Sequence, residues 1–252
     1  MIKPEFIAHR GYASHYPENT LIGIEAALNA GARFIEIDIQ ITADLIPVLF
    51  HDVDLYRITG QNGNINDVKF AQLKQFMACE TDRFKDRYKN IPIPSLAEMV
   101  ELLHHWPDAV AFVEIKTESL DRFGIEKVTR TVLDTTFPLK DRCILISYNE
   151  VALSYARKSG ATHIGWIVKS YDERSYASAR SLMPDYLFCN HTKLPPAPAP
   201  LWAGSWRWVA YEITDPALAL ELADRGVEMI ETMEIAEMLQ HPLIRDRLSH
   251  AD

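Results

Sequence analysis

The sequence predicts a (β/α)8 barrel, a closed ring of eight parallel strands covered by helices. Short β-rich runs alternate with segments of helical period, which is the pattern of a parallel sheet packed against helices. The chain has 252 residues, 48% of them hydrophobic, and a barrel of this kind typically uses about 250 residues. An open doubly wound sheet is the alternative, but no glycine-rich dinucleotide motif follows the first expected strand.

Nine β-rich runs are expected as strands. They cover residues 5–9, 33–39, 47–51, 110–116, 143–147, 163–168, 185–189, 207–212 and 227–231. Only residues 40–46 separate the second run from the third, whereas a crossover between parallel neighbours takes about a dozen residues or more. We therefore expect a hairpin here, with His51 opposite Asp38, and eight strands remain for the barrel.

Helices are expected to begin beside residues that can cap free backbone N–H groups. The expected starts lie near Asn19, Ser95, Gly124, Asn149, Tyr171, Asp215 and Glu234. Asn19 and Thr20 are interpreted as the cap of the first helix, and Pro17 as the residue that sets the turn before it.

Two stretches interrupt the alternation. Residues 52–93 are long for a barrel connection and predict a small insertion packed over one rim. In residues 194–206 the prolines leave little room for the sixth helix, so Trp202, Trp206 and Trp208 are expected beside an incompletely covered side of the barrel. No linker divides the chain, and residues 1–252 are interpreted as a single domain.

The charge balance excludes one large class of partners. There are 26 Lys and Arg residues against 35 Asp and Glu residues, a formal net charge of −9, whereas nucleic-acid binders usually carry a basic stripe. The three cysteines are too few and too widely spaced for a disulfide framework. No apolar run approaches the roughly 18 residues of a membrane span, and the first residues do not form a signal peptide. We expect no stable membrane insertion and, most simply, a cytoplasmic protein; the pattern makes no prediction of oligomeric state.

Side chains that can carry chemistry collect at the C-terminal ends of the expected strands, where barrel active sites lie. They are His9, Arg10, Glu36, Asp38, His51, Glu114 and Lys116. Glu36 and Asp38 are two residues apart on one strand, so their side chains share a face. Clustered carboxylates repel one another unless a cation holds them, and oxygen ligands favour Mg²⁺ or Ca²⁺. The alternative is a network of salt bridges to Arg10 and Lys116.

The first half of the chain resembles the glycerophosphodiester phosphodiesterase family. Residues 7–52 read IAHRGYASHYPENTLIGIEAALNAGARFIEIDIQITADLIPVLFHD, with the HRG start, the PENT segment, the ExD pair and the PV-x-x-HD strand of that family. The similarity continues through RITG at residues 57–60, IPIPSLAE before the next helix and EIK at residues 114–116, and is diffuse afterwards.

The resemblance implies a (β/α)8 barrel that hydrolyses glycerophosphodiesters to glycerol 3-phosphate and an alcohol with the help of a divalent metal. On the matching positions it implies a general acid and a general base at His9 and His51, metal ligands at Glu36, Asp38 and Glu114, and phosphate contacts at Arg10 and Lys116. Which histidine is the acid, and whether water or the neighbouring glycerol hydroxyl attacks first, are left open.

The similarity weakens near the C-terminus. Where members of the family commonly show WTVN, residues 211–214 read YEIT, so Tyr211 is expected to form an aromatic wall against glycerol while Glu212 adds an acid. Thr232 is followed by Met233 where members show TD. Two alternatives remain: a lysophospholipase D, with the Trp202–Trp208 region contacting an acyl chain, and a non-catalytic barrel that binds phosphorylated ligands.

Overall fold

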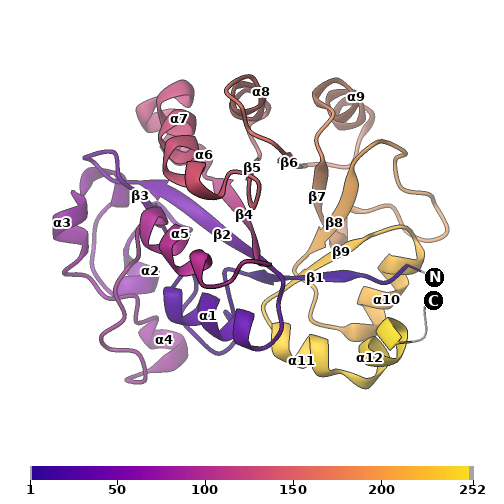
Figure 1. Ribbon diagram of the computed structural model, residues 1–252, viewed down its shortest axis with the longest axis horizontal. Helices are drawn as coiled ribbons and strands as arrows, with labels where there is room; N and C mark the ends of the chain where they lie inside the picture. The colour runs from indigo at the N-terminus through magenta and orange to yellow at the C-terminus, as the bar shows by residue number, and fades with distance from the viewer. Residues whose placement is uncertain (1, 250–252) are drawn as a thin grey trace.

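The computed structural model describes residues 2–249, and the predicted barrel is confirmed. Eight parallel strands follow the order β1-β9-β8-β7-β6-β5-β4-β2, and the pairing of β1 with β2 closes the ring. These strands are β1 (Glu5–His9), β2 (Phe34–Ile41), β4 (Val110–Ile115), β5 (Cys143–Ser147), β6 (Ile164–Ile167), β7 (Tyr186–Asn190), β8 (Arg207–Tyr211) and β9 (Met229–Thr232). Figure 1 shows the helices on the outside of this ring.

The hairpin is present, but its predicted register is wrong by one residue. Strand β3 (Pro47–Leu49) runs antiparallel to β2 with Ile39 opposite Leu49, and Phe50 N donates to Asp38 O. Phe50, rather than His51, therefore lies across from Asp38. The reason is the turn, because Leu45 adopts the left-handed conformation (φ 65°) and closes a three-residue loop at residues 43–45, whereas His51 opposite Asp38 would need a two-residue loop.

Nine helices pack around the barrel within the described residues. They are α1 (Leu21–Asn29), α5 (Leu96–His104), α6 (Thr117–Phe123), α7 (Ile125–Thr136), α8 (Glu150–Lys158), α9 (Glu173–Leu182), α10 (Pro216–Asp224), α11 (Ile235–Gln240) and α12 (Pro242–Ser249), with short 3-10 turns η2 (Phe137–Leu139) and η3 (His191–Lys193). Side-chain caps start several of them, as Ser95 shows by accepting from Glu98 N while the Glu98 carboxylate returns to Ser95 N. In residues 2–249 no helix is long and apolar enough to cross a bilayer.

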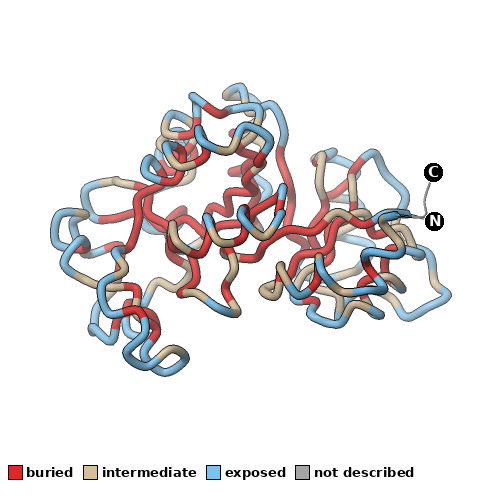
Figure 2. Tube along the Cα trace, turned by 60° about the horizontal axis from the view of Figure 1, so that its bottom comes forward, coloured by how far each residue is buried: buried red, intermediate tan, exposed pale blue. Residues whose placement is uncertain are grey.

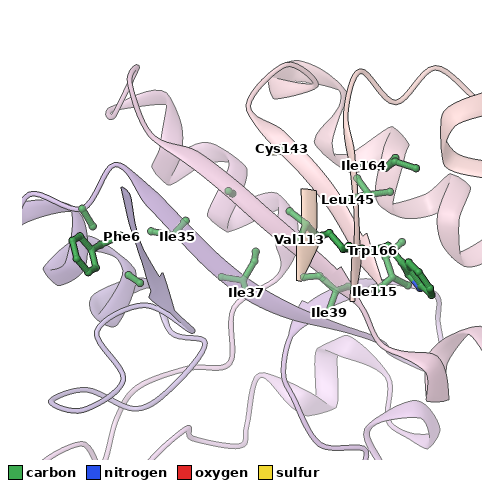
Figure 3. Close-up of a cluster of buried hydrophobic side chains, with 14 of the residues drawn as sticks. Phe6, Ile35, Ile37, Ile39, Val113, Ile115, Cys143, Leu145, Ile164 and Trp166 are labelled. Atoms are coloured by element: carbon green, nitrogen blue, oxygen red, sulfur yellow. The ribbon is translucent and has the colours of Figure 1, made fainter. Parts of the chain in front are cut away.

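Side-chain alternation along the strands separates two apolar layers. Ile35, Ile37 and Ile39 of β2 face the helices in the outer layer, which Figure 3 shows together with Val113 and Ile115 of β4. The inner layer fills the bottom of the barrel with large side chains from all around the ring: Ile7, Phe34, Phe112, Ile144, Ile146, Ile167, Phe188, Val209 and Met229. The residues that alternate with the outer layer therefore point into the barrel, and above the inner layer these include acids.

Residues 52–93 form short elements beside β3. These are α2 (Tyr56–Thr59), η1 (Ile65–Asp67), α3 (Phe70–Leu73) and α4 (Thr81–Phe84). They have an apolar cluster of their own, in which Leu55, Ile58, Ile65 and Leu73 pack under the hairpin residue Phe50. Figure 2 shows that this region is exposed over much of its surface, whereas buried segments run through the barrel.

The proline-rich segment covers the barrel without a helix. Between η3 and β8 the described chain has neither helix nor strand, as its prolines led us to expect. The side chain of Trp202 stacks on Tyr171 with ring centroids 3.9 Å apart, and Trp206 and Trp208 are buried. Aromatic packing thus replaces the sixth helix, and this side is covered more completely than predicted.

Candidate active site

A cavity of about 100 Å³ opens at the C-terminal ends of the barrel strands. Its lining residues come from every barrel strand or the residues just after it: His9, Arg10, Glu36, His51, Glu114, Lys116, Ile146, Tyr148, Ile167, Phe188, Tyr211, Glu212 and Glu231. Seven of the eight residues predicted for the site are in this lining, and the eighth, Asp38, lies beside it. The tertiary structure therefore brings all of the predicted site residues together.

The three predicted metal ligands meet on the inner face of neighbouring strands. Asp38 of β2 pairs with Glu114 of β4, and Glu36 lies two residues before Asp38 on β2. One carboxylate oxygen from each lies within 4.8 Å of the others, and all three residues are buried. This convergence follows from the two-residue period of a strand.

Two of the three acids, Glu36 and Glu114, lie where a nearby positive charge would favour their ionised forms. Burial and the neighbouring Asp38 raise the pKa of Glu36 well above its usual range, and burial raises the pKa of Glu114 to about 7, although Lys116 opposes the shift. Within the described residues the buried Oε1 atom of Glu36 has no hydrogen-bond partner. An orphaned carboxylate oxygen among three close acids fits a hard divalent cation such as Mg²⁺ or Ca²⁺.

Asp38 differs from its two neighbours because cations and an amide already surround it. Burial opposes its ionisation, but Arg10 and Lys116 together hold the pKa of Asp38 well below its usual range. Arg10 Nε lies 3.0 Å from Asp38 Oδ2, and Lys116 Nζ lies 3.2 Å from Oδ1. Asn19 makes two hydrogen bonds to Asp38. Asn19 Nδ2 donates to Asp38 Oδ2, and Asn19 Oδ1 accepts from Asp38 N.

These Asn19 contacts correct the predicted helix cap. Thr20 alone caps α1, where its Oγ1 accepts from Gly23 N at 3.3 Å. Asn19 has a left-handed backbone (φ 56°) that turns its amide toward Asp38, so it belongs to the site.

His9 lies deep in the cavity. Burial, with Arg10 adding to it, lowers the pKa of His9 to about 3, so that its ring is neutral at pH 7. The Nε2 atom lies 3.2 Å from Glu231 Oε1 and 3.8 Å from Glu36 Oε2. His9, Glu36 and Glu231 form a second group whose donor atoms lie within 4.8 Å of one another.

His51 lies at the opening, where its side chain is 32% exposed. Its Nδ1 is 2.6 Å from Asp52 Oδ1. Because an ionised carboxylate can only accept, Nδ1 carries the proton, and in the neutral ring Nε2 is left with its lone pair. The backbone of His51 is held as well, since Gln40 Nε2 donates to His51 O.

The opposite wall is aromatic and apolar. The Tyr211 and Tyr148 hydroxyls are 3.1 Å apart, and burial raises the pKa of both. Glu212 is exposed at the mouth, where Asn190 Nδ2 donates to its Oε2 at 2.6 Å. The tryptophans near the proline-rich segment line no part of this cavity, so they offer it no surface for an acyl chain.

Sequence reasoning missed several residues of the site, namely Glu18, Asn19, Asp52, Arg57, Tyr148 and Glu231 as partners of the predicted groups. Two of them carried a usable signal. Glu231 is the last residue of an expected strand, on the rim that was searched, and Asp52 directly follows His51. Arg57 opens the RITG stretch of the resemblance, but its contact with the site depends on how the insertion packs and was not predicted.

Similarity to known proteins agrees with this geometry. The model of the glycerophosphoryl diester phosphodiesterase family matches residues 9–199. The chain is 32% identical over 154 residues to a glycerophosphodiester phosphodiesterase of Bacillus altitudinis, an alignment of 61% of this chain and 62% of the relative. It is 39% identical over 111 residues to glycerophosphodiester phosphodiesterase 1 of Bos taurus, covering 44% and 33% respectively. The chain thus spans less than two thirds of the length of these curated relatives.

Solved structures share the whole fold at lower identity. A phosphodiesterase of Oleispira antarctica, solved in complex with the product sn-glycerol-3-phosphate, superposes with a TM-score of 0.81 at 24% identity, covering 97% of this chain and 96% of that one. A glycerophosphoryl diester phosphodiesterase homologue from Silicibacter pomeroyi gives a TM-score of 0.83 at 19% identity, covering 97% and 94%. At these identities the likeness establishes the barrel architecture.

Proposed function

From the premise that the chain belongs to the glycerophosphoryl diester phosphodiesterase family, we propose that it hydrolyses glycerophosphodiesters to glycerol 3-phosphate and an alcohol. The observation that carries the proposal is the convergence of two histidines, two cations and three carboxylates on one cavity. A phosphodiester is anionic and resists attack, and this set can both neutralise its oxygens and transfer protons around it.

The carboxylates Glu36, Asp38 and Glu114 would hold Mg²⁺ or Ca²⁺. When bound, the ion supplies a positive charge that neutralises phosphate oxygens and polarises the phosphorus. Arg10 and Lys116 would hold further oxygens of the phosphate. This role for Arg10 is supported by its contacts, because Asp38 and Glu18 engage its Nε and Nη1 while its Nη2 has no hydrogen-bond partner within the described residues.

The histidines would move the protons. With a proton on Nδ1 facing Asp52, an uncharged His51 ring would present the lone pair of Nε2, which is the form a general base needs to take a proton from the attacking oxygen. His9 would give a proton to the departing alkoxide from its imidazolium form, so its buried ring, which is neutral at pH 7, would first have to take up a proton. Tyr211 would line the wall against which the organic part of the substrate packs.

Release of glycerol 3-phosphate tests the proposal. Purified protein is incubated with glycerophosphocholine, glycerophosphoethanolamine and glycerophosphoglycerol in Mg²⁺ or Ca²⁺, with and without chelator. We expect metal-dependent release from at least one diester. A folded protein that releases none from any of them contradicts the proposal and favours the non-catalytic barrel, and release from lysophospholipids alone would favour a lysophospholipase D.

A further inference from the structure

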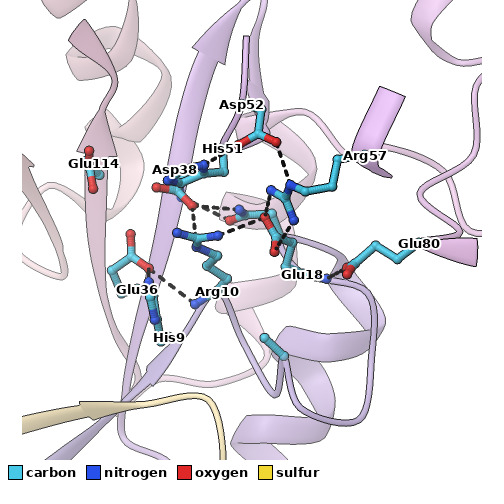
Figure 4. A network of polar contacts seen from close by, with 12 residues as sticks. His9, Arg10, Glu18, Glu36, Asp38, His51, Asp52, Arg57, Glu80 and Glu114 are labelled. Atoms are coloured by element: carbon cyan, nitrogen blue, oxygen red, sulfur yellow. Dashed lines mark hydrogen bonds and ion pairs between the residues drawn. The ribbon is translucent and has the colours of Figure 1, made fainter. Parts of the chain in front are cut away.

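A chain of ion pairs and hydrogen bonds runs behind the cavity and joins His51 to Arg10, as Figure 4 shows. It passes through Asp52, Arg57 and Glu18, none of which lines the cavity. Arg57 lies at its centre, on the short helix α2 of the insertion. Among the residues of this series of interactions, Arg57 is the one that connects the two sides of the site.

The guanidinium of Arg57 uses all three of its nitrogens. Nε donates to Asp52 Oδ2 at 2.6 Å, while Nη1 and Nη2 donate to Glu18 Oε2 and Oε1 at 2.9 and 2.8 Å. Only a planar fork can serve two carboxylates in this way, because a lysine ammonium is a point charge without fixed donor directions.

On one side, Arg57 completes the hydrogen bonding of Asp52. Each oxygen of Asp52 has its own partner, Oδ1 facing His51 Nδ1 and Oδ2 accepting from Arg57. The Asp52 side chain is 28% exposed, so without Arg57 its carboxylate would be free to rotate toward water. Rotation would break the hydrogen bond between Asp52 and His51 Nδ1, and Nε2 would then no longer be held in one orientation.

On the other side, Arg57 holds Glu18. The Glu18 side chain is only 4% exposed, and its Oε1 accepts from both Arg57 Nη2 and Arg10 Nη1, the latter at 3.0 Å. Glu80, the residue before α4, fixes the backbone of Glu18, since Glu18 N donates to Glu80 Oε1. Glu18 thereby sets the direction of the Arg10 guanidinium, which does line the cavity.

We infer that Arg57 is a positioning residue. Through Asp52 it orients His51, and through Glu18 it orients Arg10, so that the insertion fixes the proton-transfer group and the phosphate-binding group relative to each other. The inference rests on the proposed phosphodiesterase function. It assigns to residues 52–93 a part in catalysis without contact with substrate.

Steady-state kinetics of Arg57→Gln and Arg57→Lys test it with glycerophosphocholine in Mg²⁺. We expect kcat to fall about 10- to 100-fold in Arg57→Gln, as for other supporting partners of a site, and KM to rise because Arg10 loses its direction. Arg57→Lys keeps the charge and is expected to recover only part of the loss. Arg122→Gln is the matched control, because it removes an exposed ion pair between the barrel helix α6 and Asp67 of the insertion, away from the cavity.

Double variants separate positioning from general destabilisation. If Arg57 acts on kcat through Asp52, Arg57→Gln/Asp52→Asn has the kcat of Asp52→Asn within about twofold, because the second change removes nothing further. The rise in KM should likewise be shared with Glu18→Gln. The inference is overturned if the fold-loss of kcat in the double variant equals the product of the fold-losses in the two single variants. It is also overturned if a folded Arg57→Gln protein has unchanged kcat and KM.

The ring nitrogens of His51 give a readout that does not need turnover. Their ¹⁵N chemical shifts report the tautomer, and we expect protonated Nδ1 in the wild type and in Arg122→Gln, but a mixture in Arg57→Gln. If the wild type hydrolyses no diester while this dependence on Arg57 is present, the proposed function fails and the positioning role stands. A His51 tautomer that is the same in wild type and Arg57→Gln contradicts the role directly.

Discussion

The two halves of the barrel rim are built differently. The half formed by the ends of β1, β2, β3 and β4 is polar and tightly bonded, and each predicted catalytic or metal-binding group there has at least one partner within 3.3 Å. The half formed by β5 to β8 presents aromatic and apolar side chains with few hydrogen bonds, such as Ile167, Phe188 and the Tyr148–Tyr211 pair. If the proposed function holds, the difference teaches that the reacting groups are held by many partners on one side, while the other side shapes the space for the substrate.

Two acids complicate this division. Glu231 on β9 reaches His9, and Glu212 follows β8 at the mouth. Burial and the acids Glu114 and Asp38 raise the pKa of Glu231 well above its usual range. Both acids lie beyond residue 199, where the match to the family model ends.

The largest effect is expected from His51→Ala, on the polar half. Loss of a group that transfers a proton should lower kcat by about 10²- to 10⁴-fold. Measured turnover of glycerophosphocholine, with circular dichroism as the control for folding, checks this. A fully active variant would remove His51 from the mechanism and would erase the functional contrast between the halves.

Replacement of Glu18 tests whether the polar half also stabilises the fold. Burial opposes ionisation of Glu18, but its bonds to Arg57 and the charge of Arg10 lower its pKa below the ordinary value. The ionised form therefore stabilises the folded state at pH above that ordinary value, and the contribution is lost as the pH falls through the lower folded pKa. Glu18→Gln should cost about 3 kcal/mol at neutral pH, because it breaks a buried ion network.

Thermal melts of wild type and Glu18→Gln from pH 7 to pH 3 measure this contribution. The gap between the two melting temperatures should be widest at neutral pH and shrink as the solution becomes acidic. A gap that stays constant over this range would mean that the charge of Glu18 is not what stabilises the protein.

Metal binding should stabilise the polar half specifically. Mg²⁺ or Ca²⁺ at one hundred times its dissociation constant would add about 2.7 kcal/mol to the free energy of unfolding. We expect the rise in melting temperature to be largely lost in Glu114→Gln and kept in Glu231→Gln. Loss in both variants would show that the group of His9, Glu36 and Glu231 also takes part, and the ion site would then extend from the polar half to β9.

The smallest effect is expected on the aromatic half. Tyr211→Phe keeps the ring against the cavity and removes one hydroxyl from the pair with Tyr148. Net hydrogen bonds of this kind contribute about 1 kcal/mol, so kcat/KM should change only a few-fold. A loss as large as that of His51→Ala would place a reacting group on the wall that we assign to substrate shape.

Much of this site could be predicted from the sequence because the facing of its side chains depends on short-range strand alternation. The alternation of Ile35, Glu36, Ile37 and Asp38 determines which side chains point into the barrel, and the motif residues after each strand lie on one rim by the geometry of parallel strands. The prolines of residues 194–206 also predicted the absence of the sixth helix, but not the aromatic packing that covers the barrel in its place.

The tertiary structure alone decided the partners. Glu18 accepts a hydrogen bond from Arg57, which is 39 residues away in the sequence, and Asn19 binds Asp38 where a helix cap was expected. The left-handed residue Leu45 shifts the hairpin register by one residue, so that His51 lies beyond the last pair of the ladder. Periodicity says which face a side chain shares, but a hydrogen bond depends on atoms that only the folded chain brings within about 3 Å. The sequence determined which groups the rim would hold, and packing of the insertion against the barrel decided how each one is aimed.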